Sequence, residues 1–174
     1  MRKKAIIISI KGFTLSRQEI SLLSLEKPWG LILFKRNIKS FKQIQKLIKQ
    51  IRYITKDKYF PIMIDEEGSA VTRVSRIIDH NLYQKLFGDI YKINSKASTV
   101  LYKKYLFDLA NFLKKMGINI NTIPVLDVLR KNTTNIIGNR SFSDDKTIVE
   151  KLGKECVKCC EKSKIGSVIK HIPG

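Results

Sequence analysis

The chain has 174 residues, and its 34 lysines and arginines exceed its 15 aspartates and glutamates to give a formal net charge of +19. Hydrophobic residues make up 43% of the chain, which is enough to bury a core and excludes a disordered polyelectrolyte. The length predicts one domain over residues 1–174 and falls short of the ~250 residues of a closed eight-stranded β/α barrel.

The first part of the chain predicts a strand, a helix and a second strand. The apolar run at 5–10 indicates a buried strand. Ser16 is a good N-cap residue with Glu19 at the capping-box position, so we expect a helix over 17–25. After a Pro-Trp-Gly break, the apolar run at 30–34 predicts another buried strand.

An amphipathic helix and a third strand follow. Ser40 is the expected N-cap of this helix, whose apolar side chains recur at spacings of three and four residues. These side chains are Phe41, Ile44, Ile48, Ile51 and Ile54. Residues 59–64 predict a strand, and the less regular segment 76–96 predicts a short helix and loops.

The last part of the chain predicts two helices and two strands. A helix is expected over 98–116, stopped by Gly117, with one apolar face. That face comprises Leu101, Tyr105, Leu109, Phe112 and Met116. A strand over 118–122 and a polar loop over 130–144 precede a helix over 145–164, for which Gly166 is the expected terminator. Residues 167–169 begin a fifth strand.

Nearly continuous apolar strands that alternate with amphipathic helices predict a parallel sheet built from β/α units. Ligands bind such sheets at the carboxyl ends of the strands. Polar residues occur there in this sequence, namely the run Asp65-Glu66-Glu67, then Asp127, then Lys170-His171. Since three successive carboxylates cannot all face one way, at most two of the run should line a site.

Two arginines add candidate donors to these strand ends. Arg73 follows Asp65 by eight residues, and Arg140 lies in the loop before the last helix. A guanidinium group presents a fixed fork of donors that suits sugar hydroxyls and carboxylates.

The remaining motifs favour no cofactor or metal. Cys156, Cys159 and Cys160 lie in a predicted helix without a fourth zinc ligand, so we expect them in the core. His80 has no partner pattern and is expected in a surface loop. The sequence contains no glycine-rich nucleotide motif and no G-x-S-x-G elbow.

The charge and the cysteines bear on partners and location. The lysines are spread along the chain, and aromatic residues are not interleaved with the basic ones as stacking platforms, so we do not expect a nucleic-acid partner. An odd number of cysteines and no obvious export signal indicate a reducing compartment. No apolar run approaches ~18 residues, so we expect a cytoplasmic protein that does not interact with membranes.

Five motifs occur in an order that resembles the N-terminal part of family-3 glycoside hydrolases, of the bacterial β-N-acetylhexosaminidase type. The motifs are Gly30-Leu31-Ile32-Leu33-Phe34, Ile64-Asp65-Glu66-Glu67-Gly68 with Val71 and Arg73, Pro124-Val125-Leu126-Asp127-Val128, Arg140-Ser141-Phe142, and Lys170-His171-Ile172-Pro173-Gly174. One position departs from the family pattern, because Ser69 stands where the family has a second glycine.

The resemblance implies a partial (β/α)8 barrel with about five of eight strands. It implies retaining hydrolysis of terminal β-linked N-acetylglucosamine, in cytoplasmic peptidoglycan recycling. It also implies a set of sugar-binding residues, which are Asp65, Arg73, Arg140, Lys170 and His171.

The family's acid/base histidine and nucleophilic aspartate would lie beyond Gly174, so we expect no catalytic residue in this chain and no hydrolysis by it alone. The alternative hypotheses are a non-catalytic sugar-binding remnant and a basic nucleic-acid-binding module.

Overall fold

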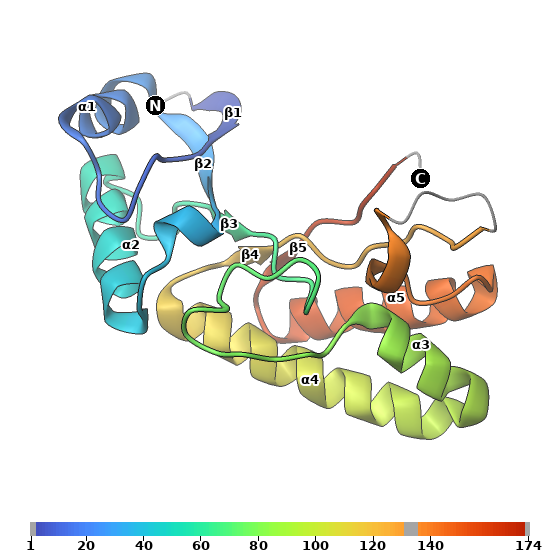
Figure 1. The fold of residues 1–174 in the computed structure, drawn as a ribbon. Coiled ribbons are helices and arrows are strands. Elements are labelled where there is room, and N and C mark those ends of the chain that lie inside the picture. Colours follow the sequence, from blue (N-terminus) through green and yellow to red (C-terminus); the bar gives the residue numbers. More distant parts are fainter. Residues whose placement is uncertain (1–2, 131–135, 173–174) are drawn as a thin grey trace.

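A computed structural model describes residues 3–130 and 136–172 and contains a five-stranded sheet (Figure 1). Every neighbouring pair of strands is parallel, and the strands lie in chain order. They are β1 (Lys4–Ile8), β2 (Pro28–Leu33), β3 (Ile62–Ile64), β4 (Ile120–Asn121) and β5 (Gly166–Ser167). The predicted α/β fold, a partial (β/α)8 barrel with five parallel strands, is therefore confirmed, and the sheet is open.

The connections between the strands hold the helices. These are α1 (Arg17–Glu26), α2 (Phe41–Thr55), α3 (Gln84–Ile93), α4 (Ser95–Met116) and α5 (Lys146–Lys162), with single 3-10 turns η1 (Lys35–Asn37) and η2 (Gly138–Arg140). The helix α1 packs on α2, α2 packs on α4, and α4 packs on both α3 and α5 (Figure 1). The topology is that of repeated β/α units.

Local sequence signals determine where the first helices begin. The Ser16 hydroxyl accepts a hydrogen bond from the amide of Glu19 at 3.2 Å, and the Glu19 carboxylate accepts one from the amide of Ser16 at 2.7 Å. This is the expected capping box. Ser40 caps α2 in the predicted way, and Ile44, Ile48 and Ile51 of α2 are buried in the core with residues of β2 and β3.

The prediction of a buried first strand is wrong. The segment is a strand, but the side chains of Lys4–Ile7 are exposed and Ile8 is only half-buried. In the described part of the chain β1 is an edge strand that pairs with β2 alone, and it is more exposed than the interior strands β2 and β3. An apolar run identifies a strand without revealing its place in the sheet.

Two predictions about the later helices also need correction. The buried face of α4 is centred on Tyr102, Leu106 and Leu113 in addition to the predicted Leu109 and Met116, while the predicted Leu101 is exposed. Tyr102 faces inward because its ring packs between those of Phe87 and Phe142. The apolar stripe of α4 is broad, so helical spacing alone does not locate its centre.

The predicted terminator of α5 is wrong as well. The helix ends at Lys162, and the left-handed residue that follows is Lys164, with φ of 54°. Gly166 belongs to β5, where a Cβ atom would come within 3.0 Å of Ile120 on β4. Gly166 therefore permits a close approach of strands and does not stop the helix.

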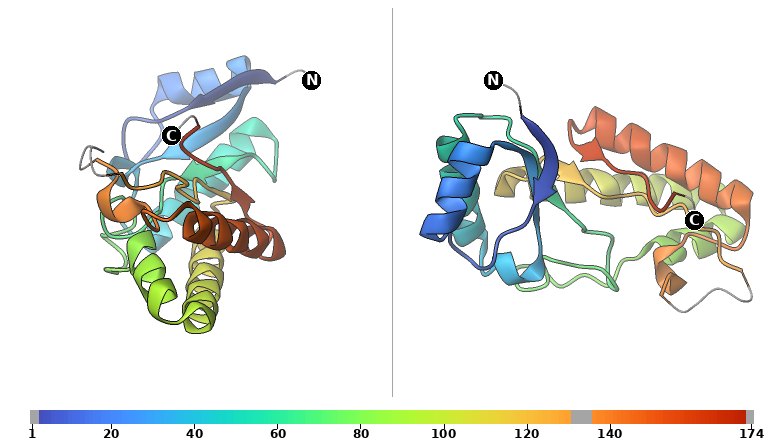
Figure 2. Two further views of the ribbon diagram at one scale, coloured as in Figure 1. Left: turned by 90° about the vertical axis from the view of Figure 1, so that its right-hand side faces the viewer. Right: turned by 90° about the horizontal axis from the view of Figure 1, so that it is seen from above.

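Beyond β4 and β5 the chain continues as two extended segments side by side, 122–128 and 168–172 (Figure 2). The amide of Leu126 donates to the carbonyl of Lys170, and the amide of Lys170 donates to the carbonyl of Pro124. These bonds carry the polar residues of both segments to the same edge of the sheet. Pro173 and Gly174 of the last motif lie outside the described residues.

We predict that Gly88→Ala destabilises the fold by roughly 1–3 kcal/mol, as overpacking commonly does. A Cβ atom at Gly88 of α3 would lie 1.8 Å from the carbonyl oxygen of Phe142, so helix and loop would have to separate. Urea unfolding measures the effect. The control is Gly12→Ala, because no atom lies within 4 Å of a Cβ there. Equal stabilities of the two variants would contradict the prediction.

Candidate functional site

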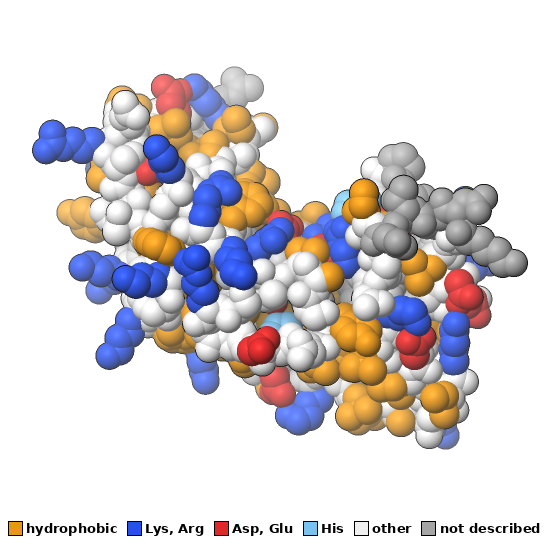
Figure 3. Space-filling model, in the orientation of Figure 1, with side chains coloured by type: hydrophobic (Ala, Val, Ile, Leu, Met, Phe, Trp, Pro, Cys, Tyr) orange, Lys and Arg blue, Asp and Glu red, His pale blue; other side chains and the backbone are white. Residues whose placement is uncertain are grey.

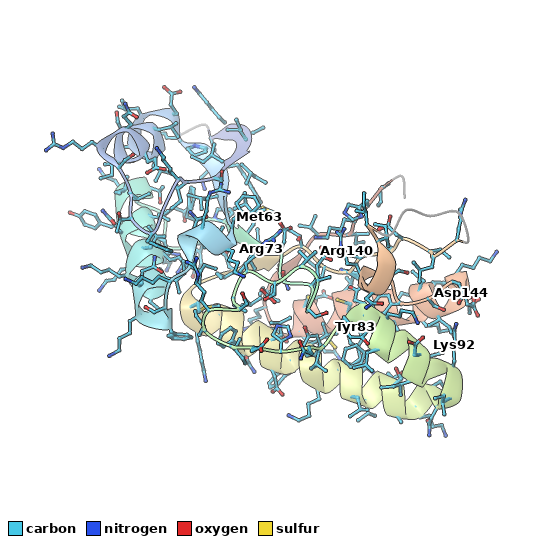
Figure 4. All side chains as sticks on the ribbon, in the orientation of Figure 1. Met63, Arg73, Tyr83, Lys92, Arg140 and Asp144 are labelled. Carbon is cyan, nitrogen blue, oxygen red and sulfur yellow. The ribbon has the colours of Figure 1, made fainter. Side chains whose placement is uncertain are left out.

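The predicted polar residues converge at the carboxyl ends of β3, β4 and β5. Asp65 follows β3, Thr122 follows β4, and Lys170 lies beyond β5. Arg73 and Arg140 lie on this side of the sheet (Figure 4). The structure thus brings all five predicted site residues into one cluster, which we call the strand-end cluster: Asp65, Arg73, Arg140, Lys170 and His171, joined by Glu67, Thr122 and Asp127.

The three successive carboxylates diverge, as expected. Asp65 and Glu67 face the cluster, whereas the Glu66 carboxylate points away and is fully buried. This alternation follows from extended backbone, in which successive side chains lie on opposite sides. Two carboxylates of the run therefore line the site.

Lys170 holds the centre of the cluster. Its Nζ lies 2.5 Å from Glu67 Oε1 and 3.4 Å from Asp65 Oδ1, and it donates a hydrogen bond to the Thr122 hydroxyl at 2.8 Å. The Thr122 hydroxyl in turn donates to Asp65 Oδ1 at 2.5 Å. The ammonium of Lys170, which lies beyond β5, therefore has partners beyond both β3 and β4.

Arg140 forms a two-pronged ion pair with Glu67. Its Nε and Nη2 lie 2.7 Å and 3.1 Å from the two carboxylate oxygens, and Glu67 is only 2% exposed in its side chain. These hydrogen bonds raise the pKa of the Arg140 guanidinium, against the opposing effect of burial. Gln84 of α3 fixes the loop, because its amide group donates to the carbonyls of Arg140 and Val125.

His171 is oriented from both sides of its ring. Nδ1 lies 2.7 Å from Asp127 Oδ2, and Nε2 lies 3.3 Å from Arg140 Nη2. A guanidinium group can only donate and a carboxylate can only accept, so Nδ1 carries the proton and Nε2 accepts. The backbone amide of His171 also donates to Asp127.

The set of sugar-binding residues implied by the resemblance does not include Glu67, Thr122 or Asp127, although Glu67 and Asp127 are among the polar residues predicted at the strand ends. Asp127 carried a signal, because it lies at a strand end within one of the five motifs. Glu67 belongs to the acidic run, but its role depends on Arg140, which is 73 residues away. Thr122 has no distinguishing pattern in the sequence.

Asp65 is held in its ionised form. Burial alone would raise its pKa, but the hydrogen bond from Thr122 and the charges of Lys170 and Arg73 outweigh burial and place the pKa below its ordinary value. Arg73 contributes through Nη2, which lies 3.2 Å from Asp65 Oδ2. Three carboxylates thus face three permanent cations in the cluster, which suits a neutral ligand rich in hydroxyl groups.

The prediction that His80 is a surface loop residue is wrong. Its side chain is only 14% exposed, and Nε2 lies 3.0 Å from Oε1 of the buried Glu66. The structure thus reveals a second, inward-facing pair directly behind the acidic run.

The cysteines lie as expected in the core. Cys156 and Cys160 are buried in α5, and Cys159 is half-buried. Within residues 3–130 and 136–172, no group of three or more histidine, cysteine or acidic side chains is arranged to hold a metal ion.

Basic side chains are distributed over much of the visible surface (Figure 3). One groove, at the opposite ends of the strands from the cluster, gathers Lys56 and Lys58 beside Tyr53 and Tyr59, which are 84% and 73% exposed. The expectation that aromatic residues are not interleaved with basic ones is wrong there. Both α2 and α4 end at this groove, and cations are favourable beside helix C-termini, which accounts for the local charge.

No helix among the described residues is long and apolar enough to span a membrane.

The family model described as the glycosyl hydrolase family 3 N-terminal domain matches residues 3–174. A β-hexosaminidase from Xylella fastidiosa is 30% identical over 174 residues, covering 97% of this chain and 50% of that protein. A β-hexosaminidase from Hydrogenovibrio crunogenus is 31% identical, with 97% and 47% covered. The chain spans about half the length of these curated relatives.

A crystal structure of NagZ from Neisseria gonorrhoeae in complex with N-trifluoroacetyl-D-glucosamine superposes on the chain with a TM-score of 0.88 at 29% identity. The match covers 99% of this chain and 50% of that one. A family 3 β-N-acetylglucosaminidase from Paenibacillus is 25% identical with a TM-score of 0.85, covering 97% of this chain and 31% of that one.

We predict that Asp65→Asn lowers the free energy of unfolding at neutral pH and that this loss disappears in acid. A depressed folded-state pKa stabilises the fold above the unfolded value of ~3.9, and this stabilisation is lost as the pH falls through the lower folded value. Urea unfolding of both proteins between pH 6 and pH 3 measures the difference.

Asp108→Asn is the matched control, because Asp108 pairs with Lys104 on the exposed surface of α4. Its effect should stay within about 0.5 kcal/mol throughout. A stability difference for Asp65→Asn that does not change with pH would contradict the prediction.

Proposed function

The chain belongs to glycosyl hydrolase family 3, and on this premise we propose that it forms the N-terminal portion of the catalytic barrel of a β-N-acetylhexosaminidase. In this proposal the whole protein removes terminal β-linked N-acetylglucosamine with retention, and the 174-residue chain contributes the part that binds the sugar. The observation that carries the proposal is the strand-end cluster, where three cations and three carboxylates converge at the site that β/α barrels use for ligands.

The cluster has the chemistry of a sugar subsite. Lys170, Arg73 and Arg140 supply donors, and Asp65 supplies acceptors, all held in place by one another. Sugar hydroxyls both donate and accept, so alternating cations and carboxylates can satisfy several of them around one ring. Preorganisation of this kind lowers the entropy cost of binding.

His171 would complete the subsite at its more exposed end. Its side chain is 44% exposed, whereas those of Lys170 and Arg140 are 15% exposed. The ring is fixed by Asp127 and Arg140, so it can present a fixed edge to a ligand.

The proposal extends to the cellular role. Cytoplasmic recycling of peptidoglycan fragments supplies saccharides with terminal β-linked N-acetylglucosamine, and the resemblance of the motifs to bacterial β-N-acetylhexosaminidases supports this role. The three cysteines, all without disulfides in the structure, are compatible with a reducing compartment.

We predict that the chain binds N-acetylglucosamine and that Lys170→Met weakens binding at least about tenfold, since the substitution leaves the Asp65 and Glu67 carboxylates without their shared cation. Saturation-transfer NMR or calorimetry measures the dissociation constant. Lys92→Met is the matched control, because Lys92 pairs with Asp144 on the surface away from the cluster (Figure 4). Absence of binding by the unsubstituted chain would overturn the proposal for this chain.

We further predict that the 174-residue chain does not hydrolyse an aryl β-N-acetylglucosaminide above background. Retaining hydrolysis needs both an acid/base group and a nucleophile, and in the proposal both are supplied from beyond Gly174. A chromogenic assay with the purified chain measures this. Turnover that Lys170→Met abolishes would show that the chain carries its own catalytic groups.

A further inference from the structure

The Glu66 carboxylate is fully buried and has three hydrogen-bond partners. Oε2 accepts from the backbone amides of Arg73 at 2.7 Å and Val74 at 3.2 Å. Oε1 lies 3.0 Å from Nε2 of His80. An ionised carboxylate can only accept, so Nε2 of His80 carries the proton in this contact.

Glu66 is also fixed through its backbone. Its amide donates to the side-chain oxygen of Asn121 on β4 at 2.9 Å, and its carbonyl accepts from the Asn121 amide group at 2.9 Å. The backbone of Glu66 thus bonds the start of the 65–74 segment to β4. The carboxylate of the same residue bonds to the amides at the end of that segment. The bond from the Arg73 amide to the Glu66 carboxylate fixes the backbone of Arg73. The Nη2 atom of Arg73 then lies 3.2 Å from Asp65 Oδ2.

We propose that His80 is a positioning residue for the sugar site, acting through Glu66 on the backbone of Arg73. This inference rests on the proposed function and deepens it. Among the described residues, the polar partner of His80 is Glu66, which is not part of the strand-end cluster, so its effect on the site is transmitted by Glu66.

The energetics favour such a role. Burying a carboxylate raises the free energy of the folded state unless the carboxylate is fully hydrogen-bonded. Loss of one partner therefore favours conformations in which water reaches the carboxylate. The segment that must open for this is the one that presents Asp65 and Arg73. Loss of the His80 contact should therefore disorder the arginine–aspartate pair.

The imidazole is held on the side remote from the site. The Tyr105 ring of α4 packs beside that of His80 with centroids 6.1 Å apart, and it stacks on Phe87 of α3 at 5.4 Å. Burial first, and then the negative charge of Glu66, raise the pKa of the Tyr105 hydroxyl. Through Tyr105, the position of His80 therefore depends on how α3 packs against α4.

The experiment compares His80→Leu, which removes the donor, with His80→Gln, which keeps a side-chain N–H at a similar reach. We expect His80→Leu to weaken N-acetylglucosamine binding about tenfold, equivalent to ~1.4 kcal/mol of coupling, and His80→Gln to restore most of the affinity. In ¹H–¹⁵N spectra of the unliganded chain, the backbone amide signals of Arg73 and Val74 should shift in the leucine variant and return in the glutamine variant.

Leu23→Ala is the control for a general loss of stability, because Leu23 of α1 is buried and lines a different pocket, with Thr55 and Phe60, at the other ends of the strands. It should lower the unfolding temperature and leave sugar affinity unchanged. Arg73 and Val74 amide signals that are indifferent to His80→Leu would overturn the inference, as would equal affinity losses in the leucine and glutamine variants. If the unsubstituted chain binds no sugar, the proposed function fails, and the amide signals still decide the role of His80.

Discussion

The ammonium group of Lys170 lies between two carboxylates from one short segment, 3.4 Å from Asp65 and 2.5 Å from Glu67. Such a partly buried cation costs desolvation energy unless its partners are held in good geometry. The carboxylates follow β3 and Lys170 lies beyond β5, so the interaction bridges strands that are not neighbours in the sheet. Thr122, beyond the intervening β4, bonds to both sides, and the ends of all three strands are thereby held together.

The rest of the site extends outward from this cation through shared partners. Glu67 pairs with Lys170 on one oxygen and with Arg140 on both, and Arg140 reaches His171, which in turn is held by Asp127. Each charged group along this path has a neighbour of opposite sign or a fixed hydrogen bond. In a chain with a net charge of +19, three of the acidic residues, Asp65, Glu67 and Asp127, thus hold the basic groups of this cluster in place.

Features of this molecule that depend on residues close together in the sequence could be predicted, whereas features that depend on residues far apart could not. The capping box of Ser16 and Glu19 involves residues three apart, so the beginning of α1 is readable from the sequence, as is the apolar stripe of α2. The exposure of β1 depends on which elements cover the sheet, and the burial of His80 depends on Glu66, fourteen residues earlier. Neither leaves a local pattern, so both were predicted wrongly.

The acidic run shows how one short segment can serve the site and the interior at once. Extended backbone sends Asp65 and Glu67 to the open side, and Glu66 to the buried side, where it accepts the amides of Arg73 and Val74. Gly68, at φ of 126°, then turns the chain so closely past Leu82 that a Cβ would lie 2.0 Å from its carbonyl oxygen. Ser69, which departs from the family's second glycine, still donates its amide to that carbonyl. The turn therefore requires glycine only at position 68. Because the three carboxylates are successive residues of one extended segment, any displacement of that segment moves the cluster-facing Asp65 and Glu67 together with the buried Glu66.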